Sequence, residues 1–408
     1  MSFIKGQPET AFLPAEFASG LSVSRAYDPR MEMFERLPAA LQPALTWLTA
    51  KPAPGEAVRE RPGWHYVAVA AAQILIGVVL AACGGHYAAG GAALPAPLFV
   101  LAVAAVPVGL LLSTSGLGLV QVVVFHHCSH GTVFRAREWN VVAGRIVSAL
   151  LLFKHFDVYK REHMLHHSAN KLLTDEDEFA DFVFGTCGLV GGVSRRRLWL
   201  RVVGNLVSPW FHARFTYRRA RAAMRSGDPI HNWLAGSFWL FVAGAAVAGH
   251  AVGLVLLAWV LPVTILLQIA TVFRILCEHS FPDEAIMVAR GKDLPHHATS
   301  GVFPGRRPPA RSLPVAARLA AWTLWWAEML SWQLFIRLFV MVGDAPCHDF
   351  HHRRPASKRW TSYIQAREAD LERVAAAQDT AYSECWGLMR AVDLTLTSLA
   401  AKPAGFRV

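Results

Sequence analysis

Two long stretches of the chain carry no charged side chain, and they limit the possible fold more than any other feature of the sequence. Residues 62–134 and residues 229–273 contain no Asp, Glu, Lys or Arg. A soluble fold rarely continues that far without a charge, whereas a bilayer core needs about 20 apolar residues for each spanning helix. Each stretch therefore has room for two spans joined by a short turn.

The composition of the whole chain supports a membrane protein. The 408 residues are 54% hydrophobic and only 17% charged, whereas about a quarter of the residues in a typical soluble domain are charged. The net charge is +11. A basic chain can bind nucleic acid, but at this hydrophobicity the excess of Arg and Lys in cytoplasmic loops explains the charge better. We expect no nucleic-acid partner, and the N-terminal residues lack the apolar core of a cleaved signal peptide.

The charge pattern predicts four spanning helices and their orientation. The spans are expected at about 64–83, 98–124, 233–248 and 254–273. The turns 84–97 and 249–253 have no charge, whereas the Arg- and Lys-rich segments flank the other ends of the spans. The positive-inside rule places those ends in the cytoplasm. The predicted fold is an all-α integral membrane protein with four transmembrane helices in two hairpins and a cytosolic helical cap, in the inner membrane if the source is bacterial.

The sequence as a whole divides into three regions. They are a cytoplasmic N-terminal lead-in at 1–61, a membrane domain at 62–356 and a cytoplasmic helical tail at 357–408. Within the membrane domain, residues 315–342 are apolar and rich in Trp, but they contain Glu328 and Arg337. Charges at the middle of a span are costly. We therefore expect an interfacial or half-buried helix here, with a fifth span as the alternative.

Nine of the 18 histidines fall into a pattern of close spacings. A four-residue spacing separates His126 and His130, the pattern His-x-x-His-His occurs at His163, His166 and His167 and again at His348, His351 and His352, and His279 follows the fourth predicted span. Helix residues three and four apart share one face, so each cluster aims several imidazoles at one point. Imidazole suits Zn, Cu, Fe and Ni. Eight or nine nitrogens are too many for one ion and predict two, without identifying the metal.

The remaining candidate features are weaker. Among the other histidines, His155, His296 and His297 lie near the clusters and their roles stay open; the rest are expected to be structural. The six cysteines form no Cys-x-x-Cys pair and are expected to be free thiols in a reducing compartment. Residues 195–225 contain nine Arg and no acid. This segment is either a solvated face with a topology signal, or a contact for lipid phosphates, an acidic electron donor or a phosphopantetheine carrier.

The order and sidedness of these parts resemble the membrane fatty acid desaturase superfamily over about residues 64–356. The likeness rests on HHCSHG (126–131), REHMLHHS (161–168), an Arg-x-x-x-Glu-His element (274–279) and CHDFHHRRP (347–355). It implies a di-iron centre, two Fe ions at the cytosolic face. The ligands carried over by position are His126, His130, His163, His166, His167, His279, His348, His351 and His352.

The resemblance also implies an activity and its partners. The expected reaction is oxidation of a C–H bond of a fatty acyl or lipid-like chain by O2, most simply desaturation; hydroxylation, ketolation and oxidative decarboxylation are alternatives. The substrate is free or linked to CoA, a carrier or a lipid. The sequence has no His-Pro-Gly-Gly motif of a fused cytochrome and no rubredoxin-like Cys pairs, so a ferredoxin or cytochrome b5-like external donor is expected to supply the electrons. A membrane metal-binding or transport protein is the alternative of another class, disfavoured by the uncharged spans.

The chain departs from the family pattern at two positions. His127 stands where bacterial members often carry an acid, and Ile275 stands where some acyl-CoA members have an Asn, so a water-mediated tenth ligand is not expected. Three acids beside the motifs are either partners of imidazole N–H groups or surface residues: Glu162, Glu278 and Asp349. The acidic run 175–178 is interpreted as a capped helix start.

Overall fold

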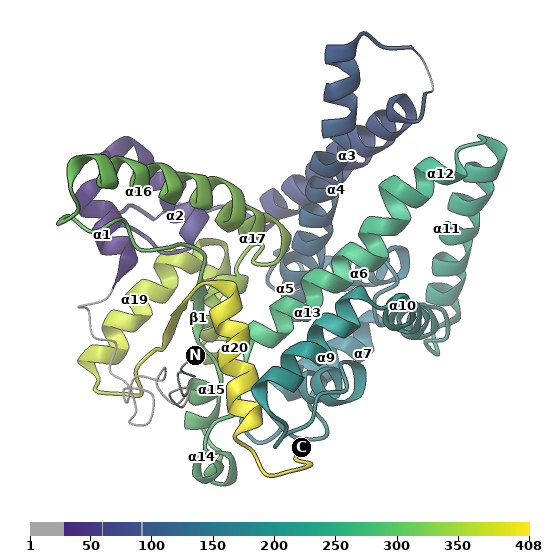
Figure 1. Cartoon of the computed structure of the whole chain (residues 1–408). Coiled ribbons are helices and arrows are strands. Elements are labelled where there is room, and N and C mark those ends of the chain that lie inside the picture. Colours follow the sequence, from purple (N-terminus) through teal and green to yellow (C-terminus); the bar gives the residue numbers. More distant parts are fainter. Residues whose placement is uncertain (1–27, 59, 91–92) are drawn as a thin grey trace, which may run out of the picture.

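The computed structural model describes residues 28–408 except 59 and 91–92, and it is built almost entirely of helices. Among these residues, four helices are long and apolar enough to cross a membrane, which confirms the predicted number. They are Gly63–Ala88, Ala96–Ser129, Pro229–Ala248 and Val252–Glu278. Their upper ends project from the body of the protein, where the connecting turns lie (Figure 1). Much of the predicted N-terminal lead-in, residues 1–27, lies outside the described part of the chain.

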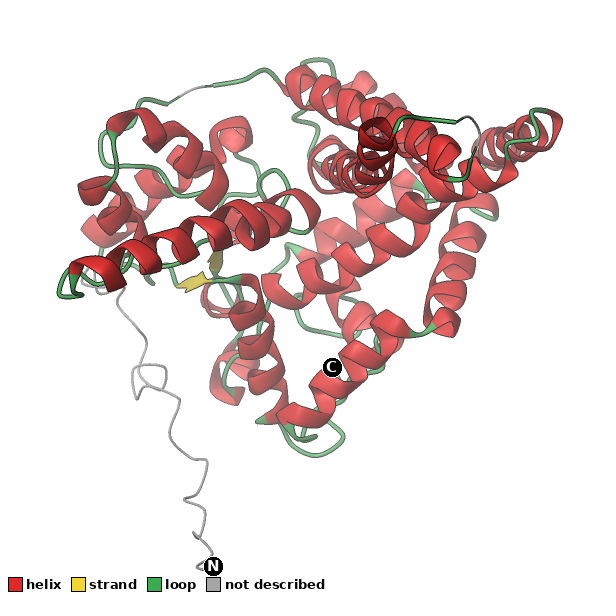
Figure 2. Ribbon diagram, turned by 45° about the horizontal axis from the view of Figure 1, so that its top comes forward, coloured by secondary structure: helices red, strands yellow, loops and turns green. Residues whose placement is uncertain are grey.

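The first half of the chain contains the first two spans. The elements are α1 (Pro29–Arg36), η3 (Ala39–Leu41), α2 (Gln42–Thr49), α3 (Gly63–Ala88), α4 (Ala96–Leu119), η4 (Val120–Phe125), α5 (His126–Ser129), α6 (Arg137–Leu150), α7 (Phe156–His166), α8 (Glu178–Ala180), η5 (Asp181–Thr186), α9 (Arg195–Val207) and α10 (Pro209–Met224). Figure 2 shows how little of the chain is strand.

The second half contains the other two spans and two short strands. The elements are α11 (Pro229–Ala248), α12 (Val252–Val255), η6 (Leu256–Val260), η7 (Pro262–Leu266), α13 (Leu267–Glu278), α14 (Glu284–Ala289), α15 (Asp293–Ala298), β1 (Gly301–Phe303), α16 (Val315–Glu328), η8 (Met329–Gln333), α17 (Leu334–Phe339), η9 (Ala345–Cys347), α18 (His348–Arg353), η10 (Lys358–Ser362), α19 (Tyr363–Ala376), β2 (Glu384–Trp386) and α20 (Leu388–Ala400).

Two of the spanning helices continue past their last apolar turn and thereby reach the histidine motifs. Helix α4 passes through the π-helical turn η4 into α5, so His126 stands on the same continuous helix as the span. Helix α13 likewise ends at Glu278, directly before His279. Backbone hydrogen bonds extend a helix whatever the polarity of its side chains, which is why both helices run beyond the predicted spans. π-helical turns often occur at functional sites, and η4 lies immediately before the first motif.

The first two spans pack with their backbones in close contact. An added Cβ at Gly77 of α3 would lie 2.4 Å from the backbone nitrogen of Ser113, and one at Gly109 of α4 would lie 2.5 Å from that of Ala81. Small residues allow such approach between membrane helices, where packing rather than water exclusion drives association. The glycines therefore fix how closely α3 and α4 approach. The arrangement of all four spans as two hairpins below a cytosolic cap stays a prediction.

The C-terminal residues are part of the main body of the protein. Strand β2 pairs in parallel with β1, in a register that places Val302 opposite Cys385. Helix α20 buries Val392, Leu396 and Leu399 in the same core as Leu276 of α13. The predicted division at residue 356 remains a prediction, but the segment that follows it packs directly against the helix that precedes His279.

The Trp-rich segment forms one continuous half-buried helix from α16 through η8 to α17. Trp325 and Met329 pack against Met33 of α1 and Leu45 and Leu48 of α2. The opposite face exposes large apolar side chains at Val315, Leu319, Leu324 and Leu330. This helix is not among the four that meet the length and polarity of a span in the described residues, which agrees with the preferred prediction for this segment.

We predict that Gly109→Ala destabilises the protein by about 1–3 kcal/mol, because the new methyl group overlaps the α3 backbone and forces the two spans apart. Thermal unfolding of the detergent-solubilised protein measures the effect. Gly244→Ala on α11 is the matched control, since a Cβ there meets nothing within 4 Å. An unchanged melting temperature for Gly109→Ala would contradict the close packing of α3 on α4.

Candidate metal centre

Four chain segments bring the nine predicted histidines into one buried region. His126 and His130 come from α5 and the residue after it, the second motif comes from α7 and the residue after it, His279 follows α13, and α18 carries the third motif. The structure divides the nine side chains into two groups. The first contains His126, His130, His163, His167 and His351, and the second contains His166, His279, His348 and His352.

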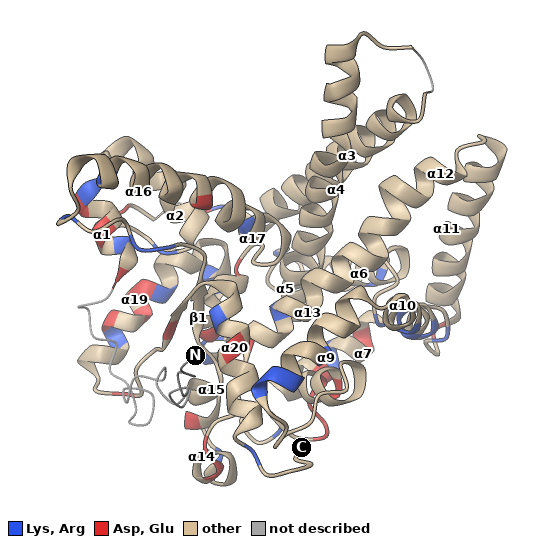
Figure 3. Cartoon of the chain, in the orientation of Figure 1, with Lys and Arg blue, Asp and Glu red and all other residues tan. Residues whose placement is uncertain are grey.

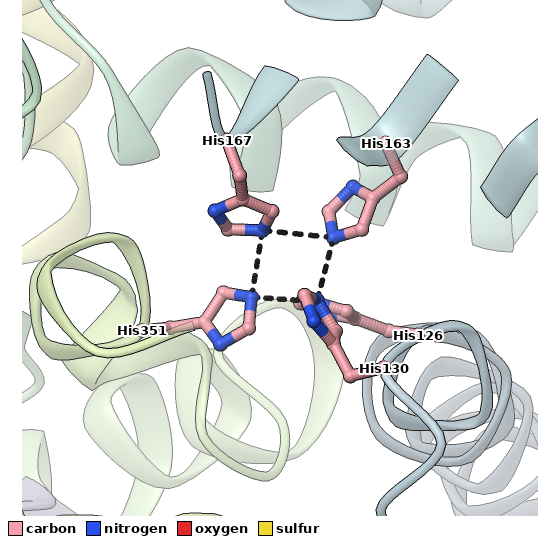
Figure 4. Close-up of side chains that lie close together, drawn as sticks. All are labelled: His126, His130, His163, His167 and His351. Atoms are coloured by element: carbon pink, nitrogen blue, oxygen red, sulfur yellow. Dashed lines mark hydrogen bonds between the residues drawn. The ribbon is translucent and has the colours of Figure 1, made fainter. Parts of the chain in front are cut away.

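The five imidazoles of the first group turn their Nε2 atoms toward one another (Figure 4). The Nε2 atom of His351 lies 2.7 Å from that of His126 and 2.9 Å from that of His167. The Nε2 atom of His163 lies 3.0 Å from that of His167 and 3.1 Å from that of His130. Five ring nitrogens thus converge from three segments of the chain.

The second group contains four imidazoles, which also converge on one another. The Nε2 atoms of His279 and His352 lie 3.0 Å apart. The ring of His279 also lies 4.7 Å, centre to centre, from the ring of His166 and 4.9 Å from that of His348. The four side chains are all buried, and Nε2 of His348 has no hydrogen-bond partner. This buried nitrogen is oriented without a protein partner, as expected of a ligand atom.

Partners on the far side of three rings determine which nitrogen carries the proton. Nδ1 of His126 donates to the carbonyl oxygen of Val122 at 3.1 Å. Nδ1 of His163 donates to Glu178 at 3.0 Å, and Nδ1 of His166 donates to Asp177 at 2.6 Å. A neutral imidazole whose Nδ1 holds the proton has a bare lone pair on Nε2. Ligating histidines in proteins are usually oriented in this way.

The spacing of these lone pairs fits metal ions. Two imidazole nitrogens bound about 2.1 Å from one ion and at a right angle to each other lie about 3.0 Å apart, and the measured Nε2 separations are 2.7–3.1 Å. The lone pairs of His126 and His163 repel neighbouring lone pairs unless a cation lies between them. The donor set, all imidazole, suits iron, zinc or copper. The two groups therefore fit two metal ions.

Burial keeps most of these rings neutral. Desolvation, reinforced by the neighbouring histidines, holds the pKa values of His163, His167, His351 and His352 well below the usual range. The same burial lowers the pKa of His130 to about 3. His166 is the exception: burial opposes its protonation, but the adjacent Asp177 carboxylate outweighs burial and raises its pKa. Neutral imidazole is the form that binds a metal ion.

The acids that orient the rings are not the ones that the sequence suggested. Asp177 and Glu178 contact the second motif, and Asp177 also accepts from the backbone N–H of Phe179 as the N-cap of α8. The capped helix start is confirmed, but its additional role was missed. None of the three suggested acids hydrogen-bonds an imidazole. Glu162 pairs with Lys154, Glu278 with Arg274, and Asp349 with Arg367.

Asp349 nevertheless helps to hold the third motif in place. It lies on α18 and is 1% exposed, and Arg367 of α19 donates to both of its oxygens at 2.8–3.0 Å. Arg367 also donates to Glu384, which in turn accepts from Lys51 at 2.6 Å. This buried network ties α18 to α19, to β2 and to the residues after α2. It fixes the helix that contributes imidazoles to both groups.

The open histidines have different surroundings. Nε2 of His127 lies 2.7 Å from Asp344, and its ring stacks on Trp360, so this side chain points away from the convergence point. His155 lies beside His231, 3.5 Å from Asp228. His296 forms a partly exposed group with Asp293 and Asp379. The six cysteines are all free, as predicted.

A cavity of about 570 Å³ leads to the histidines. Its lining includes His126, His163, His166, His279 and His348, together with the apolar side chains Phe125, Phe153, Phe179, Phe182, Phe215 and Leu267. Exposed residues at Asp175, Glu176 and Arg218 mark where it opens. Its size lies within the usual range of ligand pockets, about 300–1,000 Å³. Its wall combines these aromatic side chains with many charged ones, and it gives direct access to both groups of nitrogens.

Comparison with known protein families agrees with this geometry. The family model described as fatty acid desaturase matches residues 101–386. The chain belongs to the fatty acid desaturase family. The match includes all nine histidines, and the family together with the four apolar helices indicates an integral membrane oxidoreductase of lipid chains. No curated protein matches the chain.

We predict that Asp177→Asn lowers the iron affinity of this desaturase-family protein about 10- to 100-fold, because it weakens the hydrogen bond that orients His166. The amide keeps the volume of the carboxyl group and an oxygen for the α8 cap. Competition titration with an iron chelator measures the change. Asp175→Asn, at an exposed position in the same run, is the control and should bind iron as the unmodified protein does. Equal affinities for all three proteins would contradict the orienting role of Asp177.

A second prediction concerns the network behind α18. Arg367→Met leaves Asp349 buried without its partner, and unpairing a buried charge costs about 3–5 kcal/mol. Thermal unfolding should show a large loss of stability. The double variant Arg367→Met/Asp349→Leu removes both charges and should regain part of that loss. If the double variant is no more stable than the single one, Asp349 and Arg367 are not energetically coupled.

Proposed function

We propose that the protein is a membrane-bound di-iron oxygenase that uses O2 to desaturate a fatty acyl or lipid-like chain, with its active site on the cytoplasmic face. The observation that carries the proposal is the cavity, lined in part by aromatic side chains, that leads to both groups of convergent imidazoles. The residues proposed to hold the irons are the nine histidines of the two groups. Family membership supports the lipid substrate and the oxidation.

The protein contributes position and exclusion of water. Bound irons would supply the redox chemistry by which O2 oxidises an unactivated C–H bond. The ring of Phe179 lies tilted beside that of His279, and Phe125 contacts the ring of Tyr159, which in turn stacks on His163. These rings surround the buried nitrogens with apolar surface. An alkyl chain that enters between them would displace water and hold one carbon near the centre.

The electron balance requires an external donor. Desaturation removes two hydrogen atoms from the substrate, and reduction of O2 to two water molecules takes two further electrons and two protons. The sequence has no His-Pro-Gly-Gly motif of a fused cytochrome and no rubredoxin-like Cys pairs that could supply these electrons. We therefore propose a ferredoxin or cytochrome b5-like protein as the donor. The acyl chain arrives free or linked to CoA, a carrier or a lipid.

Hydroxylation, ketolation and oxidative decarboxylation remain the alternative outcomes, because each begins with the same oxidation of a C–H bond at such a centre. A membrane metal-binding or transport protein is the alternative of another class. Transport would require polar groups along a path through the spans, whereas the uncharged stretches cover the four helices except at the ends that lead to the histidines.

We predict that the purified protein binds two irons per chain and converts a fatty acyl substrate to a product that lacks two hydrogen atoms. Iron analysis and lipid mass spectrometry, after expression with a ferredoxin and its reductase, measure the two outcomes. A product with one additional oxygen atom would indicate a hydroxylase instead. His163→Ala should abolish the product, since it removes a ring that contacts two others at about 3 Å.

The outcome that contradicts the proposal is also specific. Zinc or copper as the only bound metal, with no oxidised lipid, would support the metal-binding alternative. An unchanged product from His163→Ala would show that the assigned centre is not where oxidation occurs.

A further inference from the structure

A second hollow of about 450 Å³ lies behind the third histidine motif and is rich in arginine. Its lining includes Arg353, Arg354, Arg359 and Arg373, with a single acid, Asp370. Phe350 forms part of its wall. No residue lines both this hollow and the cavity proposed to hold the substrate. The two spaces can therefore be occupied at the same time.

Three of the four arginines of the hollow are held in place by the protein. Asp370 is fully buried, accepts from Nε of Arg354 at 3.0 Å and from the hydroxyl of Tyr382 at 2.7 Å, and lies 3.3 Å from Arg373. Arg353 donates to the carbonyl oxygen of Ala381 at 2.8 Å. One carboxylate thus organises guanidinium groups that outnumber it, and the excess positive charge is left for a ligand or partner.

Arg359 and Arg373 are the cations most available to a partner. Among the described residues, the half-buried side chain of Arg359 makes no ion pair or hydrogen bond. Arg373 is 64% exposed, although it lies near Asp370. Fixed positive charges around a hollow attract acidic proteins, and such fields accelerate association in a way that salt suppresses.

Residues that line the hollow also lie next in sequence to histidines proposed to hold the irons. Phe350 and Arg353 belong to α18, the short helix that carries His351 of the first group and His348 and His352 of the second. A molecule seated in the hollow would therefore contact the helix that holds ligands of both groups. Helix α19, which forms the other wall, lies well away from the upper ends of the spans in Figure 1.

We propose that this arginine-lined hollow is the docking site of an acidic one-electron donor protein. The inference rests on the proposed function, because only an externally reduced oxygenase needs such a partner. Charge complementarity favours an acidic partner, and the position behind α18 favours one that delivers electrons. The substrate would occupy the other cavity, so donor and substrate would not compete.

The arginines of α9 and α10 form the alternative basic surface on which a donor protein could dock. Several of them are already engaged: Arg195 with Asp393, Arg218 with Asp181, and Arg219 with backbone carbonyls. Helix α10 also lies beside the lower end of the span α11 (Figure 3). Positive charge next to a spanning helix is the usual topology and lipid-phosphate signal, which leaves the hollow as the better donor site.

The test compares two charge-reversed pairs in the iron-loaded full chain, with an acidic [2Fe–2S] ferredoxin and its reductase as the probe. Arg359→Glu/Arg373→Glu should raise the KM for ferredoxin about tenfold and weaken its dependence on salt. Arg196→Glu/Arg197→Glu, on α9, makes the same change in net charge and should leave this KM within about twofold. The milder pair Arg359→Gln/Arg373→Gln should fall between these results.

A single turnover driven by dithionite separates this proposal from the proposed function. The dithionite-reduced Arg359→Glu/Arg373→Glu protein should form as much product as the unmodified protein, because no docking is needed. If the unmodified protein forms no product with dithionite, the proposed function fails. The docking site is overturned if the hollow variant keeps the normal ferredoxin KM, if only the α9 pair changes it, or if the unmodified protein shows no binding of ferredoxin at low salt.

Discussion

The structure depends on one electrostatic constraint: buried, neutral imidazole nitrogens face one another at about the distance of a hydrogen bond. His126 and His163 donate their Nδ1–H groups to a carbonyl and a carboxylate, so their Nε2 lone pairs point inward. Burial lowers the pKa of His163, so this ring does not take up the proton that would relieve the repulsion between lone pairs in water. Cations between the rings are the arrangement that satisfies these lone pairs. The π-helical turn before His126, the capped start of α8 and the pairing of Asp349 with Arg367 all serve to hold this arrangement.

The histidines could be predicted from the sequence because their spacing matches the helical repeat. Residues three and four apart share a helix face, so the motifs predict the nine histidines that the structure brings together. The division into two groups was not predictable. His163 and His166 belong to different groups although they stand on one helix. Which face of α7 meets α5 and which meets α13 depends on tertiary packing, about which local spacing carries no information.

The acids show where sequence reasoning failed and why. Glu162, Glu278 and Asp349 each stand next to a histidine in the chain, but neighbours on a helix point about 100° apart. They therefore pair with Lys154, Arg274 and Arg367 instead of with the rings. Asp177 reaches His166 from a turn eleven residues further on. The sequence indicated a helix cap at this acidic run, but nothing in the sequence predicted that the cap would lie against α7.

Thr395 of α20 donates a hydrogen bond to the backbone oxygen of His279. A residue made late in synthesis therefore supports one that is made much earlier. The spans emerge from the ribosome early and can enter the bilayer while synthesis continues. The histidines on α18 and the support from α20 are made more than a hundred residues after the first motif. The centre is thus incomplete until the chain up to α20 has been synthesised. Any metal ion that the two groups hold together would therefore bind late, and loss of α20 would leave a membrane-inserted protein in which His279 lacks this support.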